Sequence, residues 1–265
     1  MNTAPPPLLE AAGLTVHIGG HSSRLLTVCR NLDLSVQAGQ CLAILGRNGA
    51  GKSTLLATLA GLRPFSIGQV RLAGQPYALW PARATARQRG WLGQSQIDAF
   101  SSTVLETALT GRHPHLGRWD WESASDLDLA RQALADVGLA GLEQRTVHTL
   151  SGGERQRLAI AALLTQAPPL FLLDEPLTHL DLNHQIAVLE LFAQRAKDFG
   201  VACIMVLHDP GLAARYCDRA LLLYGDGSSE LGSSNIMLSS ERLSRLYGHP
   251  LQRLEVDGRV AFIPA

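Results

Sequence analysis

The sequence of 265 residues has few aromatic residues (5%) and no excess charge, since 23 Lys and Arg balance 23 Asp and Glu. Without net positive charge it has no general attraction to nucleic acid, so we expect no nucleic-acid partner. Long hydrophobic runs are absent: the most continuous, residues 158–173, contains polar residues and prolines and is too short to cross a bilayer. The first residues, MNTAPPP, lack the order of a signal peptide. These absences predict a soluble, intracellular protein.

Cysteine is also scarce. The four cysteines form no CxxC pair, and the nine histidines show no metal-ligand spacing. We therefore expect Cys29, Cys41, Cys203 and Cys217 to be reduced residues of the core. With 46% hydrophobic residues and no net charge, the chain has enough apolar side chains to fold around a large core.

Apolar runs alternate with helical patterns along the chain, which predicts an α/β fold with a largely parallel sheet. Between residues 96 and 150 polar helical segments dominate, for example over residues 126–137. We therefore divide one domain, residues 1–265, into an α/β core (1–95 and 151–265) and a helical subdomain (96–150). Strands are expected over residues 8–18, 30–36, 40–45, 69–72, 170–173 and 201–207, and helices over residues 52–62, 153–166 and 182–199.

A glycine-rich loop follows the expected strand at residues 40–45 and matches G-x-x-x-x-G-K-[ST]. Its glycines let backbone N–H groups surround a phosphate, and the helix that follows adds a favourable dipole. Lys52 is expected to reach the β- and γ-phosphates of a nucleotide, and the Ser53 hydroxyl to ligate Mg²⁺. The loop consists of Gly46, Arg47, Asn48, Gly49, Ala50, Gly51, Lys52 and Ser53.

Two carboxylates end the expected strand at residues 170–173. Beside a phosphate loop, Asp174 can hold Mg²⁺ and Glu175 can orient and deprotonate an attacking water. The alternative is that the acidic pair only caps the turn at Pro176. His208 follows the expected strand at residues 201–207, at the sheet edge where such sheets bind ligands, and can contact the γ-phosphate. Gln94 is a weak signal when taken alone.

A second candidate anion site is the sequence Ser151-Gly152-Gly153 at the start of a long helix. The alternative is an ordinary N-cap serine followed by flexible glycines. One nucleotide held by the first loop has no use for this second site, whereas a symmetrically arranged second subunit has.

Together these motifs resemble, in order and spacing, the ATP-binding subunit of an ABC transporter, and the resemblance covers essentially the whole chain. It rests on residues 46–54, Gln94, 150–154, 170–175, 180–181 and His208, and it adds Thr54 to the phosphate loop. It implies an ABC ATPase fold, with a P-loop NTPase core, an antiparallel β subdomain and a helical insertion.

The same resemblance implies a head-to-tail homodimer with two ATP molecules at the interface, each held by one subunit's phosphate loop and by Ser151 and Gly153 of the other. It makes Glu175 the catalytic base and His208 the residue that senses the γ-phosphate. Gln94 would link Mg²⁺ to the membrane subunit, and Asp181 would couple the two ATP sites.

One position departs from the family pattern. Members often carry an aromatic residue that stacks on adenine, and alignment places Ile18 there. Either His17 stacks instead or adenine rests on an apolar surface, so base selectivity is expected to be loose.

Three further segments, residues 111–115, 207–218 and 243–248, resemble the importer subfamily for metal chelates, namely haem, cobalamin and ferric siderophores. For Gly111–His115 the alternative is an ordinary proline turn. The resemblance implies membrane permease subunits as partners, a periplasmic or surface solute-binding protein as an indirect partner, and a peripheral location on the cytoplasmic face of the inner membrane. Haem or a corrinoid is favoured slightly over a siderophore as cargo.

Other functions fit the motifs less well. A soluble ABC ATPase that is not coupled to transport is the main alternative, but its repair-type members carry a long coiled coil between the phosphate loop and Asp174, and this interval has no heptad run. Translation-type members carry two cassettes in one chain. A P-loop kinase has no use for residues 150–154, and exporters often fuse membrane spans to the cassette.

Overall fold

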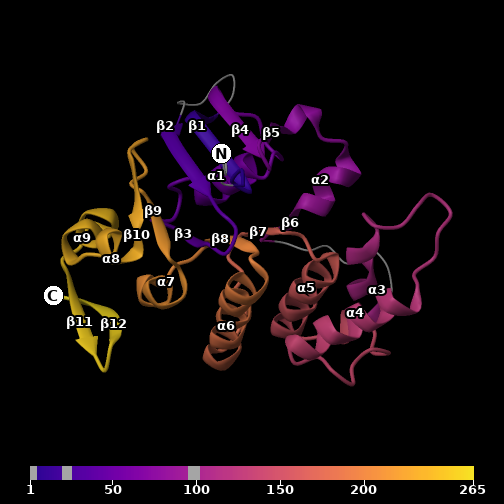
Figure 1. Cartoon of the computed structure of the whole chain (residues 1–265). Helices are drawn as coiled ribbons and strands as arrows, with labels where there is room; N and C mark the ends of the chain where they lie inside the picture. The colour runs from indigo at the N-terminus through magenta and orange to yellow at the C-terminus, as the bar shows by residue number, and fades with distance from the viewer. Residues whose placement is uncertain (1–4, 20–25, 95–101) are drawn as a thin grey trace.

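The computed structural model describes residues 5–19, 26–94 and 102–265. Its centre is a six-stranded sheet in the order β10-β9-β3-β8-β7-β6, in which β9, β3, β8, β7 and β6 run parallel and β10 is antiparallel to β9 (Figure 1). This confirms the predicted parallel sheet. The strands are β3 (Cys41–Gly46), β6 (Arg89–Leu92), β7 (Leu170–Leu173), β8 (Ala202–Val206), β9 (Arg219–Leu223) and β10 (Ser229–Ser233).

An antiparallel sheet in the order β2-β1-β4-β5 packs on one side of this central sheet. Helix α1 (Lys52–Leu59) contacts both sheets, and a hydrophobic cluster that includes Leu14, Ile44 and Leu56 fills the space around it. The helix ends before the expected residue 62, because Gly61 adopts a left-handed conformation (φ +70°). The strands of the antiparallel sheet are β1 (Leu9–Ile18), β2 (Leu26–Val36), β4 (Ile67–Leu72) and β5 (Gln75–Pro76).

Helices cover the other side of the central sheet, around a second cluster that includes Phe171 and Phe192. Strand β6 was not expected, because its sequence Arg-Gly-Trp-Leu is no apolar run. Its Gly90 allows helix α5 to approach, since a Cβ there would lie 2.4 Å from Leu163 Cδ1. The covering helices are α5 (Gly152–Gln166), α6 (Leu182–Phe199) and α7 (Pro210–Tyr216).

Residues 102–150, the described part of the predicted helical segment, contain the helices α3 (Val104–Leu109) and α4 (Ala124–Asp136), which pack on α5. Ser123 caps α4, so this helix begins two residues earlier than expected. Leu129 is 45% exposed, whereas Ala130 and Leu134 are fully buried. The division into a core and a helical subdomain stays a prediction.

Residues 234–264 form a small α+β tail, in which hairpin β11–β12 lies beside α7 (Figure 1). All four cysteines are free and buried, as predicted.

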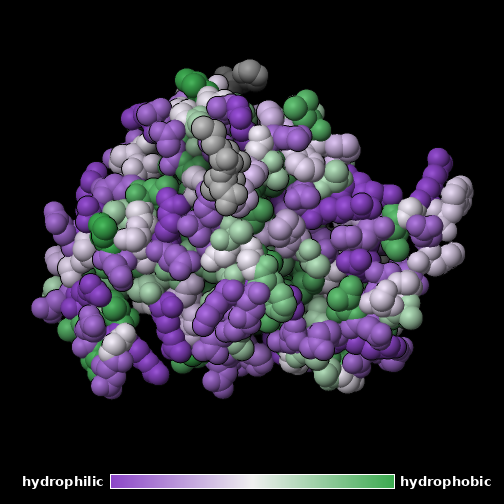
Figure 2. All heavy atoms as spheres, in the orientation of Figure 1, coloured by the Kyte–Doolittle hydropathy of each residue, from purple (hydrophilic) through white to green (hydrophobic). Residues whose placement is uncertain are grey.

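Among the described residues, no helix combines the length and apolarity needed to cross a membrane. Hydrophobic residues are scattered among hydrophilic ones on the face shown in Figure 2. The remaining elements are α2 (Ala82–Gln88), α8 (Ser234–Met237), α9 (Ser240–Tyr247), β11 (Leu251–Val256), β12 (Arg259–Pro264) and the 3₁₀ turns η1 (Tyr77–Leu79), η2 (Thr110–Arg112) and η3 (Val147–Thr149).

Candidate nucleotide site

The phosphate loop connects β3 to α1, as the motif requires. Gly49 and Gly51 adopt positive φ angles of +81° and +91°, and a Cβ at Gly51 would lie 2.7 Å from the Val28 side chain. Only glycine fits this last position without strain, because left-handed backbone and a close neighbour coincide there. The sequence thus folds into a compact loop whose backbone can surround a phosphate.

Lys52 lies inside this loop and is only 5% exposed. Its Nζ donates hydrogen bonds to the carbonyl oxygens of Gly46 (2.9 Å) and Arg47 (3.2 Å). Burial lowers the pKa of Lys52, while the nearby charges of Glu175 and Asp174 raise it. A cation held in this way by the loop's own carbonyls is positioned to exchange them for phosphate oxygens.

Ser53, Asp174 and Gln94 meet at the start of α1. Ser53 Oγ donates to Asp174 Oδ1 (2.9 Å), and Gln94 Nε2 donates to Ser53 Oγ (3.0 Å). Asp174 is 4% exposed, and its burial raises its pKa, an effect that the Ser53 hydrogen bond opposes. A hydroxyl, a carboxylate and an amide form the oxygen-rich set that suits Mg²⁺ when phosphates complete the shell, although Gln94 must then present its amide oxygen.

Glu175 lies next to this group, in a left-handed conformation (φ +52°) directly after β7. Its Oε1 accepts a hydrogen bond from Gln94 Nε2 (3.1 Å) and lies 3.1 Å from His208 Nε2. A cavity of about 260 Å³ opens between the segments that carry Glu175 and His208. The carboxylate therefore faces a space that can admit water, between two hydrogen-bonding neighbours.

Ser151 and Gly153 lie apart from this cluster. Ser151 Oγ accepts from Glu154 N (3.2 Å), and Glu154 Oε2 accepts from Ser151 N (2.7 Å), so the pair forms a capping box for α5. Both Ser151 and Gly152 are exposed. Within the described ranges, no hydrogen bond joins residues 151–153 to the phosphate loop. The structure thus contains the N-cap that was one alternative, and it leaves the helix N-terminus open to a ligand of another subunit.

Asp181 caps helix α6. Its Oδ1 accepts from His184 N (2.9 Å) and lies 2.8 Å from His184 Nδ1, and these hydrogen bonds lower the pKa of Asp181. Its side chain is 68% exposed. Asp181 is thus preformed as an acceptor on the surface, outside the cluster around Lys52.

Ile18 and His17 end strand β1. Ile18 is half-buried against the cluster around α1, and His17 Nδ1 is buried without a hydrogen-bond partner among the described residues. The turn that follows, including Gly20, lies outside the described residues. Which of the two residues faces adenine stays open.

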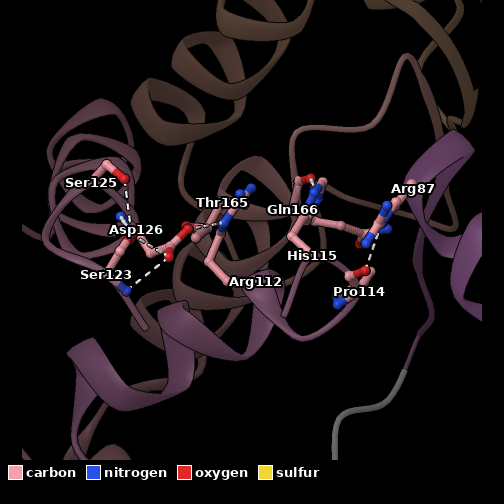
Figure 3. Close-up of polar contacts among 9 residues, drawn as sticks. All are labelled: Arg87, Arg112, Pro114, His115, Ser123, Ser125, Asp126, Thr165 and Gln166. Carbon is pink, nitrogen blue, oxygen red and sulfur yellow. Dashed lines mark hydrogen bonds and ion pairs between the residues drawn. The ribbon is translucent and has the colours of Figure 1, made fainter. Parts of the chain in front are cut away.

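Residues 111–115, which resemble a metal-chelate importer motif, hold the helical segment together (Figure 3). Arg112 Nε pairs with Asp126 Oδ1 at 2.6 Å, and Arg112 Nη1 donates to Thr165 O at 3.1 Å. His115 Nε2 lies 2.9 Å from the carbonyl oxygen of Gln166, at the end of α5. These contacts join the connection between α3 and α4 to α5, so the motif is more than a local turn. Sequence reasoning missed Asp126 as the buried acceptor of this group.

This cluster makes stability depend on pH. The pKa of Asp126 is lowered to about 2, first by hydrogen bonds from Ser123 and then by Arg112. A carboxyl whose folded-state pKa lies below its ordinary value of 3.8 stabilises the fold above that value, and the contribution is lost as pH falls toward 2. We expect Asp126→Ala to lower the free energy of unfolding at pH 7 by about 2–4 kcal/mol, measured by urea denaturation.

Asp128→Ala is the matched control, because Asp128 lies on the same helix with a 77% exposed side chain. Its effect should stay below about 0.5 kcal/mol. The difference between the two variants should shrink as the pH is lowered from 5 to about 2. A difference that is constant over this range contradicts the assignment.

The order of these elements and the nucleotide cluster define an ATP-binding cassette. The profile of the family described as ABC transporter matches residues 29–178, more than half of the chain. The protein therefore belongs to the ABC transporter family, as a subunit that binds and hydrolyses ATP in coupling to transport.

More specific relatives are importer subunits. The chain is 43% identical over 259 residues to the hemin import ATP-binding protein HmuV of Nocardia farcinica (strain IFM 10152). This alignment covers 97% of this chain and 88% of that protein. It is 41% identical over 256 residues to the protein of the same name from Streptomyces coelicolor (strain ATCC BAA-471 / A3(2) / M145), with 94% and 88% covered. A solved metal-chelate type ABC transporter in an inward-facing conformation matches with a TM-score of 0.83, 27% identity and 98% of both chains covered.

Proposed function

We propose that this protein is the ATPase subunit of a haem importer, acting as a homodimer with a separate membrane permease on the cytoplasmic face of the membrane. The observation that carries the ATPase part is the hydrogen-bonded network of Ser53, Asp174, Gln94 and Glu175, with bonds of 2.9–3.1 Å, beside the buried Lys52 of the phosphate loop. The cargo rests on the relatives named for hemin import.

In this proposal the loop and Lys52 bind the phosphates of ATP. Ser53 and Asp174, with Gln94, would hold Mg²⁺, which would neutralise phosphate charge when bound. Glu175 orients a water and takes its proton as the water attacks the γ-phosphorus, while ADP leaves. His208, 3.1 Å from Glu175, holds that carboxylate and contacts the γ-phosphate.

The second copy completes the site. Ser151 and Gly153 start α5 on the opposite face of the central sheet from α1, so they cannot serve the phosphate loop of their own chain. A head-to-tail partner would place its α5 N-terminus on the ATP, where the helix dipole favours the phosphate charge. ATP binding then closes the dimer and hydrolysis opens it, which drives the permease between two states.

Uptake in a deletion strain tests the cargo. Cells that lack this gene should lose growth on haem as the only iron source and regain it with the wild-type gene, while growth on a ferric siderophore and cobalamin uptake stay unchanged. Loss of siderophore or cobalamin uptake instead would reassign the cargo. Unchanged uptake of all three would favour the ATPase that is not coupled to transport.

Base selectivity provides a separate prediction. An apolar surface at Ile18 cannot distinguish the hydrogen-bonding edges of adenine and guanine, so we expect kcat/KM for GTP to lie within about tenfold of that for ATP. Ile18→Tyr should lower KM for ATP about fivefold or more, because stacking contributes about 1–3 kcal/mol per base. Steady-state kinetics with both nucleotides measure this. If His17→Ala raises KM for ATP to a similar degree, His17 is the stacking residue.

A further inference from the structure

The end of helix α9 lies between two parts of the nucleotide site. Tyr247 Oη donates a hydrogen bond of 3.4 Å to the backbone carbonyl oxygen of His208. At the next residue, Gly248, a Cβ would lie 3.5 Å from Arg47 Nη1 in the phosphate loop. Residues 247–248 thus contact the His208 segment and lie close to the Arg47 side chain of the phosphate loop.

The backbone at His208 lies between the sheet and the cap of helix α7, where the Asp209 side chain accepts from Gly211 N (2.6 Å) and Leu212 N (3.0 Å). The strand ends before it, with a hydrogen bond from Leu207 N to Ile44 O at 3.2 Å, and helix α7 begins only at Pro210. The His208 side chain is 51% exposed, so burial does not fix it. A hydrogen bond to the His208 carbonyl therefore restricts the peptide that joins the end of the sheet to the Asp209 cap of α7.

The tail itself is well anchored. Leu243 and Leu246 of α9 are buried, with exposed fractions of 0% and 1%. Ser244 Oγ accepts a hydrogen bond from Leu251 N at 2.8 Å, and Ser240 Oγ accepts one from Arg253 N at 2.8 Å. These two hydrogen bonds connect hairpin β11–β12 to α9. Tyr247 therefore projects from a rigid element.

The hairpin makes a second contact with the same segment. A Cβ at Gly211, three residues after His208, would lie 3.2 Å from the carbonyl oxygen of Val260 in β12.

Burial raises the pKa of Tyr247 to about 12, and the charge of Asp209 adds to this effect. The hydroxyl consequently remains a hydrogen-bond donor at any pH at which the enzyme works.

We propose that Tyr247 is a positioning residue for ATP hydrolysis: its hydroxyl holds the His208 peptide, and thereby the imidazole, in place beside Glu175. The tail that contains α9 then contributes to ATP hydrolysis through the position of His208. This inference rests on the proposed role of His208.

Tyr247→Phe is the direct test, because it removes the hydroxyl and keeps the packed ring. We expect kcat to fall about 3–10-fold, the range of one lost hydrogen bond, with KM for ATP within twofold of wild type and an unchanged thermal unfolding midpoint. Tyr216→Phe is the matched control: this tyrosine donates to Glu190 Oε1 at 3.1 Å on the far side of α7, and its loss should leave kcat unchanged. A wild-type kcat for Tyr247→Phe overturns the proposal.

A double-mutant cycle separates positioning from general stabilisation. In a His208→Ala background, measured by single-turnover hydrolysis with enzyme in excess of ATP, Tyr247→Phe should change the rate less than about twofold, the usual error of such a cycle. An undiminished 3–10-fold loss in that background means that Tyr247 acts elsewhere and overturns the proposal. If His208→Ala alone hydrolyses ATP at the wild-type rate, the proposed function of His208 fails instead.

Discussion

Replacing Glu175 by Gln is expected to lower kcat for ATP hydrolysis by about 100-fold or more, the usual size of a lost general base. The amide has the shape of the carboxylate and keeps an oxygen that can accept the hydrogen bonds from Gln94 and His208, both 3.1 Å long. It cannot take a proton from water. Hydrolysis should therefore stop while ATP binding persists, as measured by phosphate release and by nucleotide binding on the same preparation.

The same variant tests the homodimer. If ATP bridges two subunits and cannot be hydrolysed, Glu175→Gln should elute as a dimer in gel filtration with Mg²⁺ and ATP and as a monomer without them. Glu190→Gln is the control, because Glu190 lies on the outside of α6 with a 56% exposed side chain. A monomer under both conditions contradicts the shared ATP sites.

Replacing Lys52 by Met is expected to weaken ATP binding by about 100-fold or more. The substitution keeps the length of the side chain and removes a cation that is 5% exposed, donates to two loop carbonyls and interacts with the charges of two nearby carboxylates. Without the ammonium, the phosphate charge meets Asp174 and Glu175 uncompensated. Titration with a fluorescent ATP analogue measures the loss.

Lys197→Met is the natural control, since Lys52 and Lys197 are the two lysines of the chain. Lys197 lies in the last turn of α6, where its loss should leave nucleotide affinity unchanged. Lys52→Met should also fold, because a neutral side chain is easier to bury than a charged one. Wild-type affinity in this variant contradicts the assigned role of Lys52.

These outcomes also bear on how the site is built. Lys52 and Ser53 come from the start of α1, Asp174 and Glu175 from the end of β7, and His208 from the end of β8. They meet because the parallel strands β3, β8 and β7 are neighbours whose carboxyl ends share one edge. The segment Gly46–Ser53 alone therefore does not contain the proposed base, which comes from the end of β7.

Local sequence determined the elements whose signals are contained in one segment. Strand β7 and helix α6 have the predicted bounds, because a short apolar run and an Asp-capped, Gly-terminated periodic helix need no distant partner to be recognised. The phosphate loop was equally predictable, since the positive φ angles of Gly49 and Gly51 lie within the loop itself.

Tertiary contacts decided the rest. Strand β6 forms because its backbone pairs in parallel with β7, whereas its sequence Arg-Gly-Trp-Leu does not by itself favour a strand. Leu129 follows the apolar pattern but faces away from α5 toward solvent, since periodicity does not say where the neighbouring helix lies. The link between Tyr247 and His208 joins residues 39 positions apart, and only the folded tail brings them together. The sequence thus determined the chemistry of the ATP site, while packing determined which distant residues hold that chemistry in place.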